Sequence, residues 1–212
     1  MGLDKLNKAL DDEVNALKEK GTAKGKETII TGVSRAKGKK GPRYFLKGHG
    51  EKEFLRMNSN SYLGMSLEED IIKAEETASR EFGVGPGAVR FINGTFEAHR
   101  ELEKRLAVFH KREDAMVYSA AYATTIGAFA ALTTPETIII SDELNHNCII
   151  MAIRLSRPAD KKLYKHNNMQ ELEQHLKDSV GKAKRVLIVT DGIFSMRGDY
   201  APLDVVSKLS KK

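Results

Sequence analysis

A single histidine, His146, follows a short apolar run of this 212-residue sequence. The β-branched residues of Thr137–Ser141 predict a buried strand, and the polar segment after it predicts a helix over Asn145–Ser156. In open α/β sheets, ligands bind beyond the carboxyl ends of the strands. An imidazole there can lie flat against an aromatic ligand, but a histidine at such a place can equally be a hydrogen-bonded core residue. In the first case, we expect Asp142 and Asn145 to orient the ring through hydrogen bonds.

A second segment, Tyr118–Thr125, contains small residues at a predicted strand-to-helix turn. Small side chains let backbone N–H groups approach an anion, and the positive end of the helix dipole favours its charge. The hydroxyls of Ser119, Thr124 and Thr125 are candidate further donors. The segment therefore predicts a phosphate site, although small residues also serve tight packing alone.

A third segment, Thr190–Asp199, leaves the end of another apolar strand. Asp191 and Ser195 are candidate contacts to the polar edge of a ligand, or ordinary turn residues. We expect Phe194 and Met196 to lie in the core. A phosphate cradle, a stacking ring and a hydroxyl at one sheet edge together indicate a flat phosphorylated cofactor, and pyridoxal phosphate (PLP) fits that description.

Strands that alternate with helices must position these segments. We predict helices over Glu97–His110, Ala121–Leu132, Asn145–Ser156 and Asn168–Val180 and from about Leu203, and strands over Ala115–Tyr118, Thr137–Ser141, Lys162–Lys165 and Arg185–Thr190. The apolar Ala121–Leu132 helix should be buried, and Leu102, Leu106 and Phe109 should form the inner face of the helix before it. The fold class is therefore α/β, with a mostly parallel sheet and helices on both faces.

Upstream, a helix is predicted after Ser66, which forms a capping box with Glu69. Its apolar residues, from Leu67 to Phe82, should face inward, and Gly83 should end it. We also expect short strands around Thr28–Gly32 and Glu53–Met57.

The first residues predict an amphipathic helix, because apolar side chains recur every three or four positions from Leu3 to Leu17. The following arm, Lys20–Lys47, carries nine Lys and Arg residues against one acid, and the whole chain has a net charge of +6. Such an arm is a solvated connector, or it attracts phosphates of a nucleotide-like ligand, a nucleic acid or a membrane surface. We divide the chain into this helix and arm, residues 1–57, and a cofactor-binding domain, residues 58–212.

Several ordered stretches resemble the α-oxoamine synthases, a family of fold-type I PLP enzymes. The stretches that carry the resemblance are Asn58–Gly64, Arg90–Thr95, His99–Glu103, Ser141–His146, Asn167–Glu173 and Asp191–Met196. The resemblance implies an aminotransferase-like large domain, a homodimer, and small amino acid and acyl-CoA substrates. Within the family, Arg90–Thr95 and Asn167–Glu173 resemble the 2-amino-3-ketobutyrate CoA ligase branch most, with 8-amino-7-oxononanoate synthases as the alternative.

The resemblance also implies roles for single residues. The backbone of Ala121 and Tyr122 would hold the cofactor phosphate, and His146 would stack on the pyridine ring. Ser195 would lie near the ring hydroxyl, with Asp191 in the same loop. Asn60 would face the amino-acid substrate. Two positions depart from the family pattern: Ala121–Tyr122 replace a Gly-Phe or Cys-Phe pair, and Thr125 replaces an Asn.

The Schiff-base lysine of the family, the acid that pairs with the pyridine nitrogen and a second histidine have no counterpart here. We therefore expect an N-terminal half that binds PLP weakly and turns nothing over by itself. The expected function of the whole enzyme is condensation of glycine, or another small amino acid, with an acyl-CoA, and Lys37–Lys47 is a candidate contact to the CoA phosphates. The rivals are a non-catalytic partner of the same fold and a phosphate- or nucleic-acid-binding module driven by the arm.

The composition narrows the setting. No apolar run approaches the roughly 20 residues of a membrane span, and the acidic N-terminus is unlike a secretory or transit signal. Cys148 is the only cysteine, which excludes an intrachain disulfide and favours a reducing, cytoplasmic location. We expect no metal, no membrane and no nucleic acid as partners.

Overall fold

The structure is a computed structural model that describes residues 2–211. The chain divides into two compact units, Met1–Gly87 and Ala88–Lys212. The boundary predicted between residues 57 and 58 concerns where the cofactor domain begins, and it stays a prediction.

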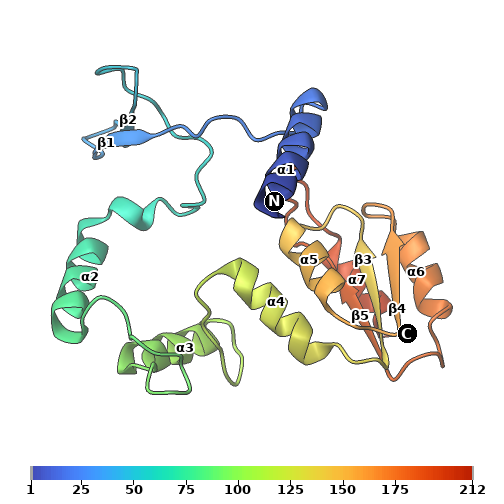
Figure 1. The fold of residues 1–212 in the computed structure, drawn as a ribbon. Helices are drawn as coiled ribbons and strands as arrows, with labels where there is room; N and C mark the ends of the chain where they lie inside the picture. Colours follow the sequence, from blue (N-terminus) through green and yellow to red (C-terminus); the bar gives the residue numbers. More distant parts are fainter. Residues whose placement is uncertain (1, 212) are drawn as a thin grey trace. The chain divides into compact units, whose positions relative to one another are not determined.

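A parallel sheet forms the centre of the C-terminal unit (Figure 1). Its middle strand β3 (Thr137–Asp142) pairs on one side with β4 (Asp160–Tyr164) and on the other with β5 (Arg185–Val189). All six residues of β3 are buried, as the unbroken run of β-branched side chains predicts for a strand covered on both faces. The predicted α/β class and parallel sheet are confirmed.

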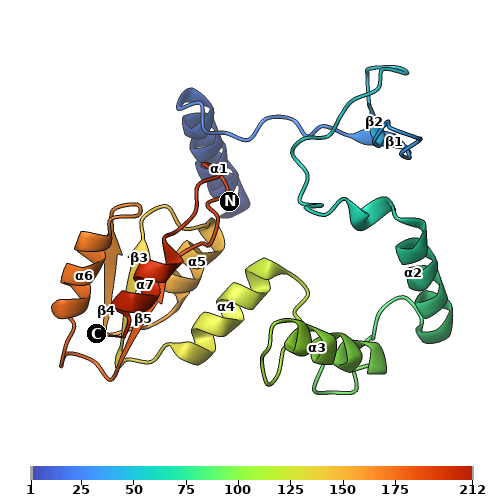
Figure 2. The same ribbon diagram turned by 180° about the vertical axis from the view of Figure 1, so that it is seen from behind.

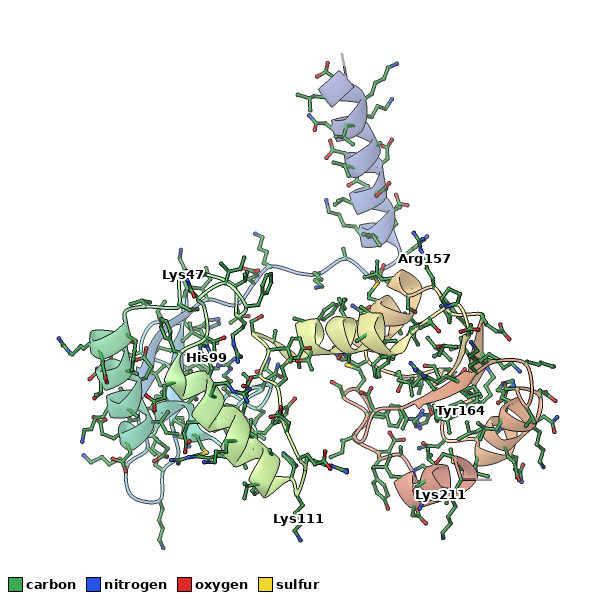
Figure 3. All side chains as sticks on the ribbon, turned by 90° about the horizontal axis from the view of Figure 1, so that it is seen from below. Lys47, His99, Lys111, Arg157, Tyr164 and Lys211 are labelled. Atoms are coloured by element: carbon green, nitrogen blue, oxygen red, sulfur yellow. The ribbon has the colours of Figure 1, made fainter. Side chains whose placement is uncertain are left out.

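Helices cover both faces of this sheet (Figure 2). Because side chains alternate along a strand, Ile139 points to one face, while Ile138 and Ile140 point to the other. The Ile139 face packs against α4 (Ala121–Leu132) and α5 (Asn147–Leu155). The opposite face packs against α6 (Met169–Lys177) and α7 (Leu203–Leu209), and Tyr164 lies within this second core (Figure 3). Burial raises the pKa of Tyr164 to about 12.

The first elements of this unit differ from the prediction. Helix α3 (Glu97–Phe109) forms, but Leu102 and Phe109 are exposed, while Glu103 and Ala107 are buried. The predicted strand Ala115–Tyr118 is absent, and the backbone N–H of Val117 instead donates to the Glu103 carboxylate at 3.0 Å. Helix α4 was expected to be buried, and only Phe129 is. The local sequence pattern was misleading for two reasons. A strand forms only when another strand pairs with it, and an apolar helix face is buried only when another element packs against it.

The N-terminal unit begins with α1 (Gly2–Glu19), which confirms the predicted amphipathic helix. A hairpin of β1 (Ile30–Ser34) and β2 (Arg43–Leu46) follows. The second strand was expected at Glu53–Met57, and this was wrong: Phe54 makes one isolated bridge, to Tyr44. Aromatic residues favour strands, and the strand that pairs with β1 contains Tyr44 and Phe45 rather than Glu53–Met57.

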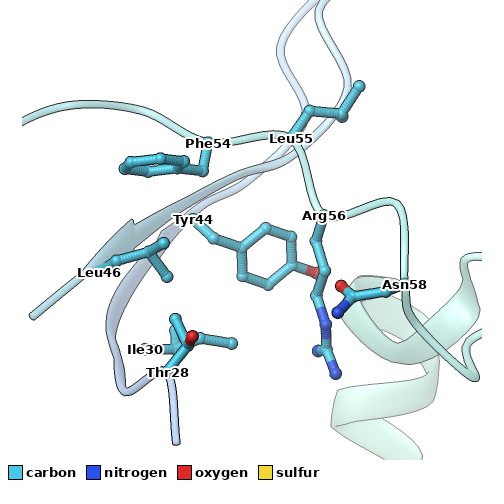
Figure 4. A pocket seen from close by; sticks show the side chains of 8 residues that line it. All are labelled: Thr28, Ile30, Tyr44, Leu46, Phe54, Leu55, Arg56 and Asn58. Atoms are coloured by element: carbon cyan, nitrogen blue, oxygen red, sulfur yellow. The ribbon is translucent and has the colours of Figure 1, made fainter. Parts of the chain in front are cut away.

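The irregular segment after the hairpin closes a cavity of about 350 Å³ against it (Figure 4). The Arg56 guanidinium lies over the Tyr44 ring, 5.6 Å from its centroid. The lining residues are Thr28, Ile30, Tyr44, Leu46, Phe54, Leu55, Arg56 and Asn58.

Helix α2 (Glu69–Phe82) ends at Gly83 as predicted. The capping box was wrong: the N-cap is Glu68, without a side-chain bond, and Ser66 lies in the short 3₁₀ helix η1 (Met65–Leu67), where it accepts the Ser61 hydroxyl at 3.1 Å. No residue of α2 is buried, so the inward-facing burial expected for its apolar residues was wrong. None of the helices within residues 2–211 is long and apolar enough to cross a membrane.

Candidate functional site

The three segments chosen from the sequence meet at the carboxyl edge of the sheet. The Asn147 amide donates to the Tyr122 hydroxyl at 3.4 Å, and the Cys148 thiol to the Thr125 hydroxyl at 3.5 Å. These contacts join the first turns of α4 and α5. The Asp191 carboxylate accepts the backbone N–H of His146 at 2.7 Å, which joins the loop after β5 to the same place.

The side chain of Asn145 links β3, β5 and the loop after β5 by hydrogen bonds. Its buried amide donates to the Ser141 hydroxyl and to the Val189 carbonyl, both at 2.9 Å, and its oxygen accepts the Asp191 N–H at 2.7 Å. Asn145 was expected to orient the imidazole of His146, and this was wrong. Because its side-chain amide is used on β3, β5 and the loop after β5, it holds the two loops in register instead.

His146 is the N-cap of α5. Its Nδ1 accepts the Cys148 N–H at 3.1 Å and lies 3.0 Å from the Cys148 sulfur. A nitrogen that accepts a backbone N–H carries no proton of its own, so this contact fixes the tautomer of a neutral ring. The side chain is exposed, which excludes the alternative of a core histidine. The helix orients the ring and leaves the imidazole accessible to a ligand.

The N-terminus of α4 offers backbone donors. No side chain caps this helix, and Ala121 and Tyr122 in its first turn are exposed. The hydroxyls of Thr124 and Thr125 donate back to the carbonyls of Ala120 and Ala121, each at 3.0 Å, so they are not the outward-facing donors that the sequence suggested. An uncapped helix start suits a phosphate, because its first N–H groups have no partner within the helix.

The loop after β5 closes on itself between Ile193 and Tyr200. Phe194 is buried, as predicted, but Met196 is almost fully exposed, so its expected core position was wrong. Ser195 lies between them and is exposed. Asn60 is exposed too and belongs to the N-terminal unit. The roles expected for Ser195 and Asn60 stay predictions.

A second histidine, His166, was missed. Its two ring nitrogens lie 3.1 Å from Asp142 and 3.0 Å from Asp199. Asp142 was expected to orient His146, and this was wrong: it contacts His166 instead. The same carboxylate also accepts the backbone N–H groups of Leu144 and Asn167. The hydrogen bond to Asp199 raises the pKa of His166 above its ordinary value, burial opposes this, and Asp142 adds to the rise. The sequence signal was available: His166 directly follows the predicted strand Lys162–Lys165.

The described part of the chain contains no candidate metal site. Within residues 2–211, no group of three or more His, Cys, Asp or Glu side chains is arranged to hold a metal ion.

Comparison with known proteins identifies the family of this chain. Residues 52–212 match the family model described as aminotransferase class I and II. The chain belongs to this family. Its members use PLP, and the curated relatives of this chain are α-oxoamine synthases.

Two of these relatives carry different names at similar identity. The chain is 43% identical over 202 residues to 8-amino-7-oxononanoate synthase 1 of Bacillus velezensis, covering 95% of this chain and 49% of the relative. It is 40% identical over 210 residues to human mitochondrial 2-amino-3-ketobutyrate coenzyme A ligase, covering 99% and 48%. The chain thus spans about half the length of the curated relatives it matches.

Solved structures of the family share the fold. Sphingomonas wittichii serine palmitoyltransferase superposes with a TM-score of 0.82 at 28% identity, covering 96% of this chain and 48% of that one. Serine palmitoyltransferase of S. paucimobilis, solved with a PLP–myriocin aldimine bound, gives 0.81 at 26% identity, covering the same 96% and 48%. The predicted aminotransferase-like fold and family are therefore confirmed, for a part of that fold.

Proposed function

We propose that this chain supplies the PLP-holding edge of an enzyme that condenses a small amino acid with an acyl-CoA. The observation that carries the proposal is the hydrogen bond between His146 and Asp191, which brings an exposed imidazole and the loop of Ser195 to one place. The uncapped start of α4 lies against α5 at the same edge. An anion-binding helix start beside an accessible aromatic ring fits a flat, phosphorylated cofactor.

Each residue has a stated task in this proposal. The backbone of Ala121 and Tyr122 binds the phosphate, His146 covers a face of the ring, and Ser195 donates to its hydroxyl. Asp191 acts through His146, whose backbone it holds. When bound, PLP supplies the electron sink for a carbanion at the amino-acid carbon. Asn60 contacts the amino acid, and the Schiff-base lysine of the family is not among these residues.

The substrate pair is the finer part of the proposal. The stretches Arg90–Thr95 and Asn167–Glu173 favour glycine and a short acyl-CoA, as in the 2-amino-3-ketobutyrate ligases. The 43% identity to an 8-amino-7-oxononanoate synthase supports that second candidate equally well. A cytoplasmic location and a homodimer belong to the same proposal, the first supported by the single cysteine, Cys148.

The basic arm is the proposed contact to the CoA phosphates. Lys40 pairs with Glu53, whereas Lys39 and Lys47 are exposed and make no ion pair within residues 2–211. Charge reversal of Lys39 and Lys47 in the complete enzyme should raise the KM for acyl-CoA without changing kcat. An unchanged KM would remove the arm from the proposal.

Variants of His146 test the cofactor site directly, because they separate the two tasks of this side chain, capping α5 and covering the cofactor ring. In His146→Asn, the side-chain oxygen can still cap α5, but the ring is gone; in His146→Ala, both are lost. Asn should keep the unfolding free energy within about 0.5 kcal/mol of wild type, and Ala should lose about 1 kcal/mol. Both should weaken PLP binding roughly tenfold, the upper range for one aromatic contact.

The measurement is an NMR titration of the 212-residue chain with PLP, with urea unfolding of the same samples. His110→Asn is the matched control, since His110 is exposed at the end of α3, away from the sheet edge. If His146→Asn binds PLP as tightly as wild type does, the proposed role of His146 is wrong.

A further inference from the structure

His166 adds a further link between the end of β3 and the loop after β5, apart from the one that Asn145 and Asp191 make. One ring nitrogen faces Asp142 at the end of β3, and the other faces Asp199 in the loop after β5. A neutral imidazole has one N–H and donates only once, so two carboxylate contacts are both satisfied only by the imidazolium form. The ring is largely buried and stands edge-on to Phe194, with 4.4 Å between the centroids.

The charges around this ring favour its protonated form. Asp142 is buried, and Glu143 accepts the backbone N–H of His166 at 3.1 Å. Of the neighbouring cations, Lys165 pairs with Glu143 at 3.0 Å, whereas Arg197 shares Asp199 with His166 and contacts the same carboxylate oxygen at 3.2 Å. Tyr164, two residues before His166, stays neutral because burial raises its pKa to about 12.

His166 contacts the loop after β5 at two residues, Asp199 and Phe194. The Phe194 N–H donates to the Asp199 carbonyl at 2.8 Å, and the Gly198 N–H to the Phe194 carbonyl at 2.7 Å. His166 therefore holds both sides of the loop, Asp199 by hydrogen bonding and Phe194 by ring packing. Ser195 is the next residue after Phe194 and has no hydrogen bond of its own within the described residues.

We propose that His166, as an imidazolium, is a positioning residue that fastens the Ser195 loop to the sheet and releases it when the proton is lost. The proposal rests on the proposed function, since Ser195 is a cofactor contact only there. His166 itself touches no cofactor, and it acts through Phe194 and Asp199.

The direction of the pH effect follows from the two pKa shifts. The pKa of His166 is raised, so its contribution is complete below the ordinary histidine value of about 6.5 and is lost as the pH rises through the raised folded value. The pKa of Asp199 is lowered, mainly by its hydrogen bond to His166, so its contribution is complete above about 3.9 and is lost as the pH falls through the lowered value. The loop is held best between these limits.

Amide hydrogen exchange of the cofactor-free 212-residue chain tests the fastening. After correction for intrinsic rates, protection of the Phe194 and Gly198 amides in wild type should fall roughly tenfold or more between pH 6 and pH 9, as expected for losing hydrogen bonds to a charged group. His166→Gln should show the low protection at both pH values, and His110→Gln should match wild type. Unchanged loop protection in wild type, or a pH response that persists in His166→Gln, overturns the proposal.

Two further readouts keep the outcome decisive. The amides of Ile139 and Ile140 in β3 report whether a variant is folded, and Asp199→Asn, at a more exposed position, replaces His166→Gln if that variant unfolds. PLP titrations should show binding weakened in both His166→Gln and Ser195→Ala. A loosened loop with unchanged PLP affinity in His166→Gln refutes positioning, whereas unchanged affinity in both Ser195→Ala and His146→Asn refutes the cofactor site and leaves the pH-dependent loop standing.

Discussion

Asn145 and Asp191 are joined directly, because the side-chain oxygen of Asn145 accepts the backbone N–H of Asp191 at 2.7 Å. Asp191 in turn accepts the N–H of His146, the residue that follows Asn145. The two loops are thus tied by a pair of hydrogen bonds in opposite directions. This arrangement fixes the backbone on which the candidate cofactor residues stand, and it involves no ligand.

Replacing Asn145 by Ala should destabilise the chain by about 3 kcal/mol, because the buried Ser141 and the partly buried Val189 and Asp191 lose their hydrogen bonds at once. Urea unfolding measures this loss. Asn147→Ala is the control, since Asn147 is exposed and makes one contact of 3.4 Å; it should change stability by less than about 0.5 kcal/mol. Equal effects of the two variants would mean that the Asn145 bonds are not what holds the edge.

Gly94 should not tolerate a side chain. A Cβ atom there would lie 2.0 Å from the Ala88 carbonyl oxygen and 2.6 Å from that of Val89, and both are rigid backbone atoms. We expect Gly94→Ala to cost about 3 kcal/mol, at the upper end for overpacking. Gly192→Ala is the matched control, because nothing lies within 4 Å of its Cβ position. Thermal unfolding of both variants tests this, and an unchanged midpoint for Gly94→Ala would contradict the close approach.

Glu103 should make stability depend on pH in the acid range. Its pKa is lowered, first by the hydrogen bond from the Val117 backbone and then by Arg90 and Arg100, against the effect of burial. A lowered carboxyl pKa stabilises the fold above the ordinary value of about 4.3, and the gain is lost as the pH falls through the folded value. Glu103→Gln should therefore be less stable than wild type at pH 7, with the gap closing at low pH.

Urea unfolding from pH 7 down to pH 3 measures that gap. The exposed Glu97 provides the control variant, Glu97→Gln, which should follow wild type at every pH. A gap between Glu103→Gln and wild type that stays constant with pH would assign the effect to packing rather than to charge.

The stripe on α1 should mediate the proposed homodimer. Its apolar side chains are exposed in this chain; they are Leu3, Leu6, Leu10, Val14 and Leu17. Leu10→Glu should weaken association at least tenfold in sedimentation experiments, because one buried leucine contributes about 1.5–3 kcal/mol. Asn15→Glu introduces the same charge on the opposite side of α1 and should leave association unchanged. Equal association of both variants would assign the dimer contact to another surface.

The helices and the central strand were predictable because their signals are local. Asn168 caps α6 by accepting the Glu171 N–H, as its place before an apolar period suggested. The family stretches likewise singled out His146 and Asp191. The strand predicted at Ala115–Tyr118 failed because pairing requires a neighbour, which a local pattern does not supply.

The sequence by itself determined that the chain alternates strands and helices, and it predicted that three loops form a PLP site. Only the tertiary structure decided which carboxylate meets which histidine. Asp142 and His146 are four positions apart, yet Asp142 bonds His166 across the neighbouring strand, and His146 caps its own helix. The reason is geometric: parallel strands bring distant loop ends to one edge, where partners are chosen by position in space rather than by distance along the chain.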